Sequence, residues 1–293
     1  MAKTLTTPAP GQSIPPAPRL ISRAEIQGGT LGSLLAAYGI DPEAIAQALL
    51  AEEERWLLFE TTQDLLKADR NGVSDIYRLD LITPELRLVS RTPQGVAANG
   101  PSRYPASDAR GELLVFQSDA SDLVEEDDNG VTDIFLHELG LGTTRRLTTQ
   151  AGLASAHPTL DASGEALLYD QGDESGGRQV LADSPWGDLE AEPLSLAWNE
   201  AGLVLDNHHP AISADGRFVA YLEQELGEGA TRCQVHFYDR DSERYQRLAC
   251  SDWLLEVGER RRPAFSPDGA WLDWVEFGAD EVLTLPNPLL TAP

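Results

Sequence analysis

The sequence has 293 residues, of which 41% are hydrophobic, and a formal net charge of −26. Such an acidic chain is long enough for one large domain and would be repelled by nucleic acids and anionic membranes, so neither is expected as a partner. It contains no run of about eighteen apolar residues, which excludes a membrane-spanning helix and predicts no membrane insertion.

The N-terminal region is predicted to hold a flexible tail and then a helix. Five prolines with Thr, Ser and Gln among residues 5–18 are typical of an extended tail, assigned to residues 1–18. Asp41 and Pro42 fit a helix cap and the first helical position, and apolar residues follow at helical spacing. We therefore expect a short helical insertion within residues 31–54, before the first repeat.

Four prolines mark a repeat in the rest of the chain. Each is followed six residues later by a glycine and eleven residues later by an aromatic residue, and successive prolines are 53, 52 and 53 residues apart. The prolines are Pro105, Pro158, Pro210 and Pro263, and the aromatic residues are Phe116, Tyr169, Tyr221 and Trp274. A fixed period of this length with short strands is typical of a repeat architecture.

Each repeat is interpreted as four strands. In the second repeat these are residues 103–108, 112–118, 132–138 and 144–148, with alternation suited to half-buried strands. Four-stranded antiparallel units arranged about an axis form a β-propeller, so the sequence predicts an all-β fold.

The turns after the later prolines support the same fold. They have the pattern Ser-x-Asp-Gly, in residues 213–216 and 266–269, and an apolar run that ends in an aromatic residue follows. This combination resembles the TolB-like β-propeller repeat of bacterial proteins over about residues 56–285. The resemblance implies a binding scaffold, the role of most members, although some members are enzymes.

The two ends of the repeat region are predicted to meet. The last repeat lacks a fourth strand, and residues 19–23 match the outer strand at residues 87–91 in four of five positions. We expect the N-terminal strand to close a ring of five four-stranded blades, because an unclosed ring would expose long strand edges. Six blades would need a blade built from residues 24–55. The result is one propeller domain, residues 19–286, and a C-terminal tail, residues 287–293.

Two loops in the first and second repeats carry alternating oxygen donors around a glycine. The second loop has Glu125, Asp127, Asn129 and Asp133, and the weaker first loop has Asp69, Asn71 and Asp75. This spacing is similar to that of a calcium loop, in which alternate side chains supply oxygens to one ion. The alternative is an Asx-turn, in which Asp and Asn bond their own backbone. The sequence requires no cofactor, and Ca²⁺ is the ion that it indicates.

A second candidate site consists of the residues that precede the four prolines. These residues are Tyr104, His157, His209 and Arg262. Equivalent positions on successive inner strands converge on the channel of a propeller, where imidazoles can bind a metal or transfer protons. The resemblance to TolB-like proteins adds that some lyases of this group, which cleave acidic sugars, have histidines at such a channel. The alternative is a structural role, in which the rings cap the strands.

The two cysteines flank a predicted hairpin. With the turn at Arg240–Glu243, Cys233 and Cys250 lie directly opposite each other on adjacent strands. This proximity predicts a disulfide, and the alternative is two free buried thiols in a cytoplasmic protein.

The sequence favours a non-catalytic module that binds another protein with a basic surface and is monomeric by itself. Its binding face is predicted on the acidic loops, because seven acidic residues and no basic residue lie between Asp119 and Asp133. Two alternatives stay open: a lyase or hydrolase that acts on carbohydrate at the channel mouth, and a calcium-stabilised structural domain of a larger exported protein. The expected compartment is periplasmic or extracellular if a signal peptide has been removed, and cytoplasmic otherwise.

Overall fold

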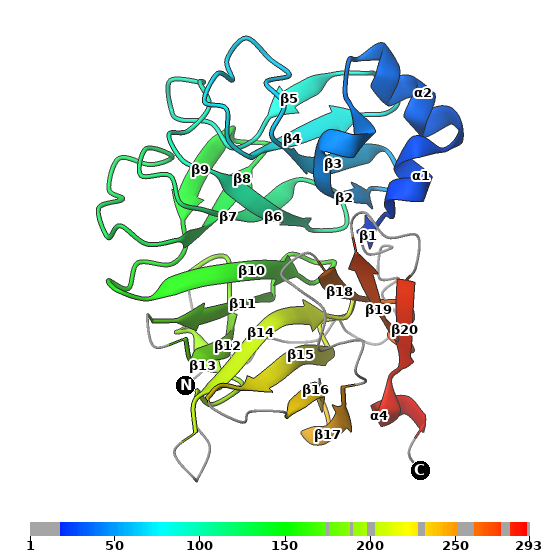
Figure 1. Cartoon of the computed structure of the whole chain (residues 1–293), viewed down its shortest axis with the longest axis vertical. Helices are drawn as coiled ribbons and strands as arrows, with labels where there is room; N and C mark the ends of the chain where they lie inside the picture. Colours follow the sequence, from blue (N-terminus) through cyan, green and yellow to red (C-terminus); the bar gives the residue numbers. More distant parts are fainter. Residues whose placement is uncertain are drawn as a thin grey trace.

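The computed structural model describes residues 18–173, 176–187, 190–197, 203–227, 232–250, 261–276 and 282–291. The predicted N-terminal tail lies outside the described residues, apart from Pro18. The chain forms an all-β propeller, in which five sheet units follow one another around the molecule (Figure 1). In this described part, no helix is long and apolar enough to cross a membrane.

Every unit begins with an inner strand, and successive inner strands from β2 to β18 contact each other. The first unit has β2 (Ile45–Ala51), β3 (Trp56–Thr61), β4 (Asp75–Asp80) and β5 (Leu86–Leu88). The second has β6 (Ser102–Ser107), β7 (Leu113–Ser118), β8 (Asp133–Glu138) and β9 (Thr143–Arg146). The third has β10 (Ala154–Leu160), β11 (Leu167–Gly172), β12 (Arg178–Asp183) and β13 (Glu192–Pro193). The fourth has β14 (Leu205–Ile212), β15 (Phe218–Glu225), β16 (Cys233–Asp239) and β17 (Arg244–Ala249). The described residues of the fifth form β18 (Arg261–Phe265), β19 (Trp271–Glu276) and β20 (Val282–Pro286).

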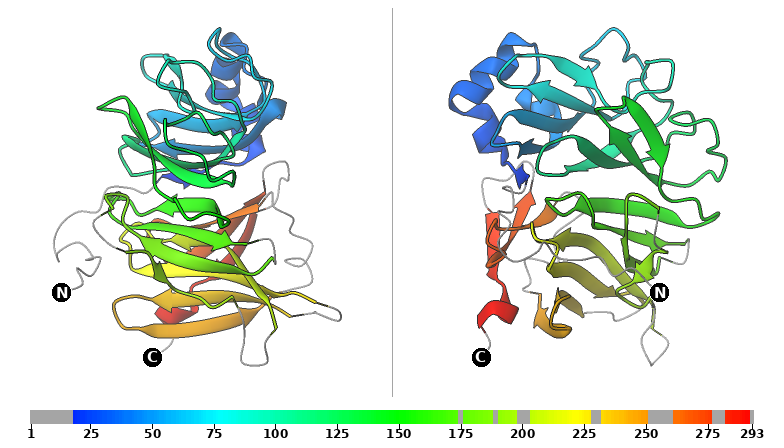
Figure 2. Two further views of the ribbon diagram at one scale, coloured as in Figure 1. Left: turned by 90° about the vertical axis from the view of Figure 1, so that its left-hand side faces the viewer. Right: turned by 180° about the vertical axis from the view of Figure 1, so that it is seen from behind.

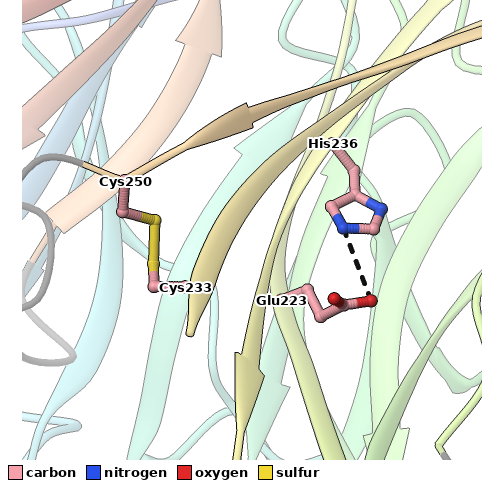
Figure 3. Close-up of a disulfide and its surroundings, with 4 residues drawn as sticks. All are labelled: Glu223, Cys233, His236 and Cys250. Carbon is pink, nitrogen blue, oxygen red and sulfur yellow. Dashed lines mark ion pairs between the residues drawn. A yellow bond between two sulfur atoms is a disulfide. The ribbon is translucent and has the colours of Figure 1, made fainter. Parts of the chain in front are cut away.

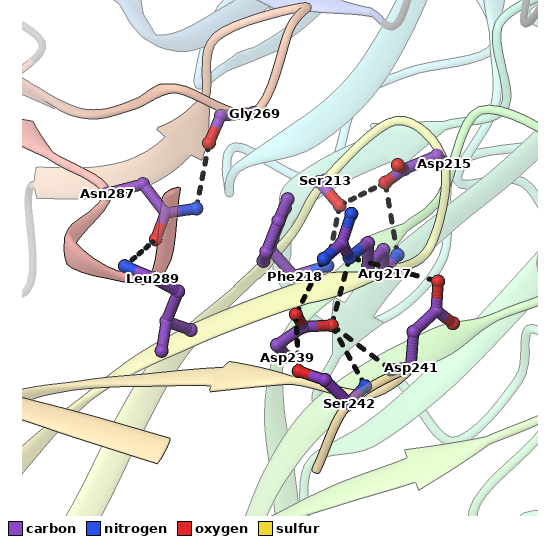
Figure 4. A network of polar contacts seen from close by, with 10 residues as sticks. All are labelled: Ser213, Asp215, Arg217, Phe218, Asp239, Asp241, Ser242, Gly269, Asn287 and Leu289. Atoms are coloured by element: carbon purple, nitrogen blue, oxygen red, sulfur yellow. Dashed lines mark hydrogen bonds and ion pairs between the residues drawn. The ribbon is translucent and has the colours of Figure 1, made fainter. Parts of the chain in front are cut away.

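The residues that define the repeat build its core and its turn. The core aromatic residues, each at most 3% exposed, are Phe59, Phe116, Tyr169, Tyr221 and Trp274. In the turn before β15, Ser213 Oγ accepts the N–H of Phe218 at 2.8 Å, and Gly216 has a φ angle of 74°, which glycine adopts without strain. Arg217 follows the glycine and pairs with Asp239 at 2.7 Å (Figure 4). The glycine of the repeat is therefore a requirement of this turn.

The helical region lies earlier in the chain than predicted. Helices α1 (Arg23–Gln27) and α2 (Gly29–Ala37) pack beside the first unit (Figure 2). Asp41 does act as a cap, since its Oδ1 accepts the N–H of Glu43 at 3.0 Å. The helix that it begins is only one 3₁₀ turn, η1 (Pro42–Ala44). The prediction of a helix beyond this turn is wrong.

Strand β2 replaces that helix because both of its faces are buried. Ala48 and Leu50 pack into one core cluster, whereas Leu49 and Ala51 pack into a second cluster on the other face. A strand buried on both faces has a continuous apolar run, which can imitate helical spacing. The six-blade alternative fails for the same reason, because residues 24–55 form helices and one inner strand.

The N-terminal strand does not close the last unit. Strand β1 (Arg19–Leu20) pairs antiparallel with β2 of the first unit. Ser22 then caps α1, and Ile21 and Ile26 are fully buried in the core of the first unit. Burial of two isoleucines in the first unit stabilises this position of the N-terminal segment, although the sequence of residues 19–23 is like that of an outer strand. Among the described strands, β20 pairs with β19 alone.

The predicted C-terminal tail is partly folded. Helix α4 (Pro288–Thr291) follows β20, and Leu289 is 4% exposed in the core shared by the fourth and fifth units. The side-chain amide of Asn287 donates to the carbonyl oxygen of Gly269 at 2.9 Å (Figure 4). The assignment of residues 287–293 to a tail is therefore wrong as far as residue 291.

Candidate functional site

Three of the four predicted channel residues share an unusual backbone conformation. Tyr104, His157 and His209 have φ angles of 55°, 51° and 53°, a region that residues with a Cβ atom rarely adopt. Each lies where its inner strand shifts register against the second strand of the unit. Arg262 differs, because β18 pairs with β19 in continuous register.

A side chain from the preceding unit holds each of these left-handed residues. The hydrogen bonds run from Tyr104 N to Glu60 Oε2 at 3.1 Å, from His157 N to Gln117 Oε1 at 2.8 Å and from His209 N to Asp170 Oδ2 at 3.1 Å. Each acceptor directly follows the core aromatic residue of its own unit. Sequence reasoning missed these three acceptors. The sequence did carry a signal for them. A polar residue follows the aromatic residue in the first three repeats, whereas the apolar Leu222 follows it in the fourth.

The structure brings the four predicted channel residues together. The rings of His157 and His209 stack with centroids 3.8 Å apart, and the ring of Tyr104 lies edge-on to His157 at 4.5 Å. The guanidinium of Arg262 donates to the carbonyl oxygens of the first two repeat prolines, and its bond to Pro158 is 2.6 Å long. All four residues are buried, with exposed fractions of 5–8%. We call these four residues the channel cluster.

Burial controls the charges in the channel cluster. It holds the pKa of His157 and of His209 well below the ordinary value, because a charged ring would lose its hydration. Burial also raises the pKa of Asp170 to about 6, although Arg178 opposes this shift. Asp170 Oδ2 lies 2.6 Å from His157 Nδ1. Near neutral pH the two rings are therefore uncharged, and Arg262, whose pKa burial lowers to about 10, stays charged.

The channel cluster combines acid–base groups with tight packing. Arg262 lines a cavity of about 50 Å³, whose other walls are mostly inner-strand residues, together with Pro18, Leu20 and Ala214. This volume holds a few water molecules and is far below the size of a small-molecule site. His209 Nε2 has no hydrogen-bond partner among the described residues, so one ring nitrogen is chemically available.

The two acidic loops form Asx-turns. In the second loop, Asn129 Oδ1 accepts the N–H of Val131 at 3.2 Å, and its amide group donates to Asp133 Oδ2 at 2.8 Å. Asn71 and Asp75 repeat this arrangement in the first loop. These bonds match the backbone-bonded alternative to a calcium loop.

Protein groups occupy most of the oxygens that calcium would need, although Glu125 is exposed and Asp69 Oδ1 has no hydrogen-bond partner among the described residues. Arg146 Nη1 lies 2.6 Å from Asp127 Oδ1 and 3.4 Å from Asp133 Oδ2, and Asp69 accepts the hydroxyl of Tyr77. In the ranges that the structure describes, no group of three or more His, Cys, Asp and Glu side chains could hold a metal ion. The cation beside Asp127 is an arginine, so these residues do not fit a calcium ion in this arrangement.

The predicted hairpin register and disulfide are confirmed. Strands β16 and β17 pair so that Gln234 faces Ala249, and Cys233 and Cys250 form a disulfide with Cα atoms 5.3 Å apart (Figure 3). The alternative of two free thiols is therefore wrong. The bond ties together the two outer strands of the fourth unit.

Comparisons with known proteins bear on the fold. No protein-family model matches the sequence, and no curated protein matches it. The structure is similar to TolB from Acinetobacter baumannii, with a TM-score of 0.52 and 17% identity over 81% of this chain and 53% of that chain. It is also similar to a putative TolB from Agrobacterium tumefaciens, with a TM-score of 0.52 and 15% identity over 81% of this chain and 73% of that chain. An oligogalacturonate lyase from Vibrio parahaemolyticus gives a TM-score of 0.52 and 12% identity over 83% of this chain and 62% of that chain.

These likenesses establish a shared architecture. The chain spans about half the length of the Acinetobacter TolB that it matches, and all three identities are 17% or lower. Similarity at this level shows fold and leaves function to be argued from the site itself. The chain is a β-propeller with a fold similar to that of TolB and of other propeller proteins.

Proposed function

We propose that this chain is a non-catalytic, TolB-like binding module that recognises another protein with a basic surface. The main support is the packing of the channel cluster, whose four residues are 5–8% exposed. Arg262 bonds the backbone carbonyls of Pro105 and Pro158 in two other units, and the ring of His157 bonds the side chain of Asp170. Residues used in this way hold the scaffold, and recognition then falls to the loops that the scaffold positions.

Three exposed carboxylates in the second acidic loop supply the binding surface. Glu125, Glu126 and Asp128 are exposed, and none has an ion-pair partner among the residues described. We call them the acidic rim. Their neighbour Asp127 is neutralised by Arg146 at 2.6 Å, so the charge that a partner would meet comes from the rim itself. A cluster of one sign attracts an oppositely charged surface, and salt weakens that attraction.

The proposal includes a periplasmic or extracellular location and a chain that is monomeric until it meets its partner. The disulfide between Cys233 and Cys250 gives modest support, because such bonds persist in oxidising compartments.

A lyase or hydrolase acting at the channel is the second candidate. Its support is the unpartnered Nε2 of His209, together with the structural likeness to oligogalacturonate lyases. One of these was solved in complex with manganese and has a TM-score of 0.50 and 17% identity to this chain. Turnover of an oligogalacturonate by the intact chain, abolished by His209→Gln, would favour this candidate over the binding module.

Charge reversal tests the binding module directly. The intact protein and the double variant Glu125→Arg/Glu126→Arg serve as immobilised baits for an extract of the source organism, with captured proteins quantified by mass spectrometry. A basic protein should be captured by the intact chain, released by moderate salt and lost from the variant.

The matched control reverses two exposed carboxylates in turns between first and second strands, Glu112→Arg/Glu165→Arg. It changes the net charge equally and should leave capture intact. Cross-linking of the captured protein to these turns, with no dependence on the acidic rim, would contradict the proposal. His157→Ala should not affect capture if the channel is only structural.

A further inference from the structure

The fourth unit contains a polar row that the preceding units lack. Tyr221, His236 and Arg247 lie directly opposite one another on β15, β16 and β17. In the first three units, the residues opposite the core aromatic residue are Tyr77, Phe135 and Leu181. The fourth unit therefore places an ionisable ring where its neighbours place core side chains. Burial of a polar group at a core position needs a compensating partner.

A cavity of about 460 Å³ lies beside this row, between the third and fourth units. We call it the groove. Leu194 and Leu196 of the third unit form an apolar wall, and Glu223 joins the polar row on the side of the fourth unit. The volume is within the range of small-molecule sites, and an apolar wall facing a few polar groups is their usual composition.

His236 presents an unmatched nitrogen at the groove. The residue is 1% exposed, and its Nδ1 lies 2.9 Å from the hydroxyl of Tyr221 and also contacts the hydroxyl of Tyr245. Its Nε2 lies 3.4 Å from Glu223 Oε2 (Figure 3) and has no hydrogen-bond partner among the described residues. A buried nitrogen without a partner is costly, and a bound molecule that reaches it would recover that cost.

The groove also has one positive and one negative group on its wall, and the negative one, Glu223, lies 3.4 Å from His236 Nε2. Arg247 packs over the ring of Tyr245 at 5.1 Å, and no acidic side chain in the described part of the chain lies within ion-pair distance of it. The nearby Arg232 and Glu225 neutralise each other at 3.7 Å. His236 and the positive charge of Arg247 hold the pKa of Glu223 below its ordinary value, so this carboxylate is ionised.

We propose that the groove binds a free α-amino acid with an apolar side chain. Arg247 takes the carboxylate, Glu223 takes the ammonium group, and Leu194 and Leu196 receive the side chain. A ligand with only a negative charge is opposed by Glu223, and one with only a positive charge is opposed by Arg247. Complementarity to both charges therefore selects a zwitterion. This site is separate from the acidic rim and from the channel cluster.

Calorimetric titration of the full chain tests the charge requirement. The probes are L-phenylalanine and L-leucine, with 3-phenylpropionate as the analogue without the ammonium group and phenethylamine as the analogue without the carboxylate. Both amino acids should bind, and each truncated analogue should bind at least about tenfold more weakly. Equal binding of 3-phenylpropionate and L-phenylalanine, or no binding of either amino acid, would overturn the proposal.

Three variants locate the site. Arg247→Gln should weaken L-phenylalanine binding at least about tenfold, and Arg87→Gln, at an exposed arginine of the first unit, should leave it unchanged. His236→Phe introduces the residue found at the same position of the second unit, Phe135, so we expect it to fold; it removes the ring nitrogen beside Glu223 and should weaken binding. L-phenylalanine binding that is unchanged in both Arg247→Gln and His236→Phe would place the amino acid elsewhere and overturn the proposal.

Discussion

The channel cluster and the groove of the fourth unit each bury a histidine ring with one unpartnered nitrogen, but the channel rings pack against one another, whereas His236 lines a cavity. In the channel, the rings of His157 and His209 stack at 3.8 Å, and His157 bonds Asp170 at 2.6 Å. In the groove, His236 borders a cavity of about 460 Å³ and faces it with an unpartnered nitrogen. Buried rings with shifted pKa values occur at both structural and functional sites. The space beside the ring therefore distinguishes a binding histidine from a structural one better than burial does.

The repeat itself supports this distinction. Residues before the repeat prolines take the same backbone conformation in three units, and each donates its N–H to a side-chain oxygen of the unit before. A feature copied around a propeller serves the contacts between neighbouring units. His236 is instead found in one unit alone among the first four, since the first three have Tyr77, Phe135 and Leu181 at this position. Residues that break a consistent repeat pattern are expected at functional sites, where function is kept at a cost in stability.

The largest expected effect is the loss of Arg262 from the channel cluster. Arg262→Met removes the donors of two buried carbonyl groups, including that of Pro158. Leaving both carbonyls without donors should lower the free energy of unfolding by about 3 to 5 kcal/mol. Urea denaturation followed by tryptophan fluorescence measures this change.

The matched arginine is Arg247 in the groove, which forms no ion pair among the described residues. Arg247→Met should change the free energy of unfolding by about 0.5 kcal/mol or less. Equal destabilisation by the two substitutions would remove the distinction between a structural arginine and one kept for binding.

The disulfide should affect the groove more than the channel. Cys233 and Cys250 close a loop of 17 residues and join the strands that carry His236 and Arg247. The double variant Cys233→Ser/Cys250→Ser should lose about 3 kcal/mol of stability, because the cross-link restricts the unfolded chain. The same variant should bind L-phenylalanine more weakly. A variant with unchanged stability and unchanged binding would show that the hairpin is held without the bond.

The parts of the chain that follow the regular repeat could be predicted from the sequence, and the irregular parts could not. The repeat spacing predicted the strands of the second unit to within two residues, and the turn at Arg240–Glu243 predicted the pairing of Cys233 with Cys250. Both rest on local rules that successive units share. The first unit was harder, because β2 is buried on both faces and its apolar run is compatible with a helix.

The candidate site was only partly accessible to the same reasoning. Equivalent positions in the repeat brought Tyr104, His157, His209 and Arg262 together correctly, yet nothing in their types revealed how tightly they are packed. The groove was missed because His236 lies in an ordinary strand pattern. Its meaning appears only when the strand register places it opposite Tyr221, at a core position of the other units.

The pH dependence of stability should come from the channel rings. Their folded-state pKa lies well below the ordinary value of about 6.5, so the unfolded chain takes up protons first as the pH falls. Stability should therefore be lost below about pH 6.5, by about 1 kcal/mol per ring at pH 5.5. Asp170 acts oppositely, because its pKa is raised to about 6, and its contribution is lost as the pH rises through that value.

Replacing one ring isolates this effect. His209→Gln should lose less stability than the intact chain between about pH 7.5 and about pH 5.5, by about 1 kcal/mol. Urea denaturation at the two pH values measures the difference, with the exposed-site variant Glu112→Gln as control. An equal loss in the intact chain and in His209→Gln would mean that this ring is already charged in the folded protein.

The smallest expected effect concerns Asp127 of the second acidic loop, whose carboxylate already pairs with a protein group, Arg146. Asp127→Asn keeps an oxygen that can accept from Arg146 but removes the charge of a pair 2.6 Å apart. We expect a loss of less than about 1 kcal/mol, because the hydrogen bond survives in a weaker form. Millimolar calcium should leave the melting temperature of both proteins unchanged, since Arg146 already occupies the place of a cation. A calcium-dependent rise in the intact chain that Asp127→Asn abolishes would instead show that an ion displaces Arg146 and stabilises the native state by mass action.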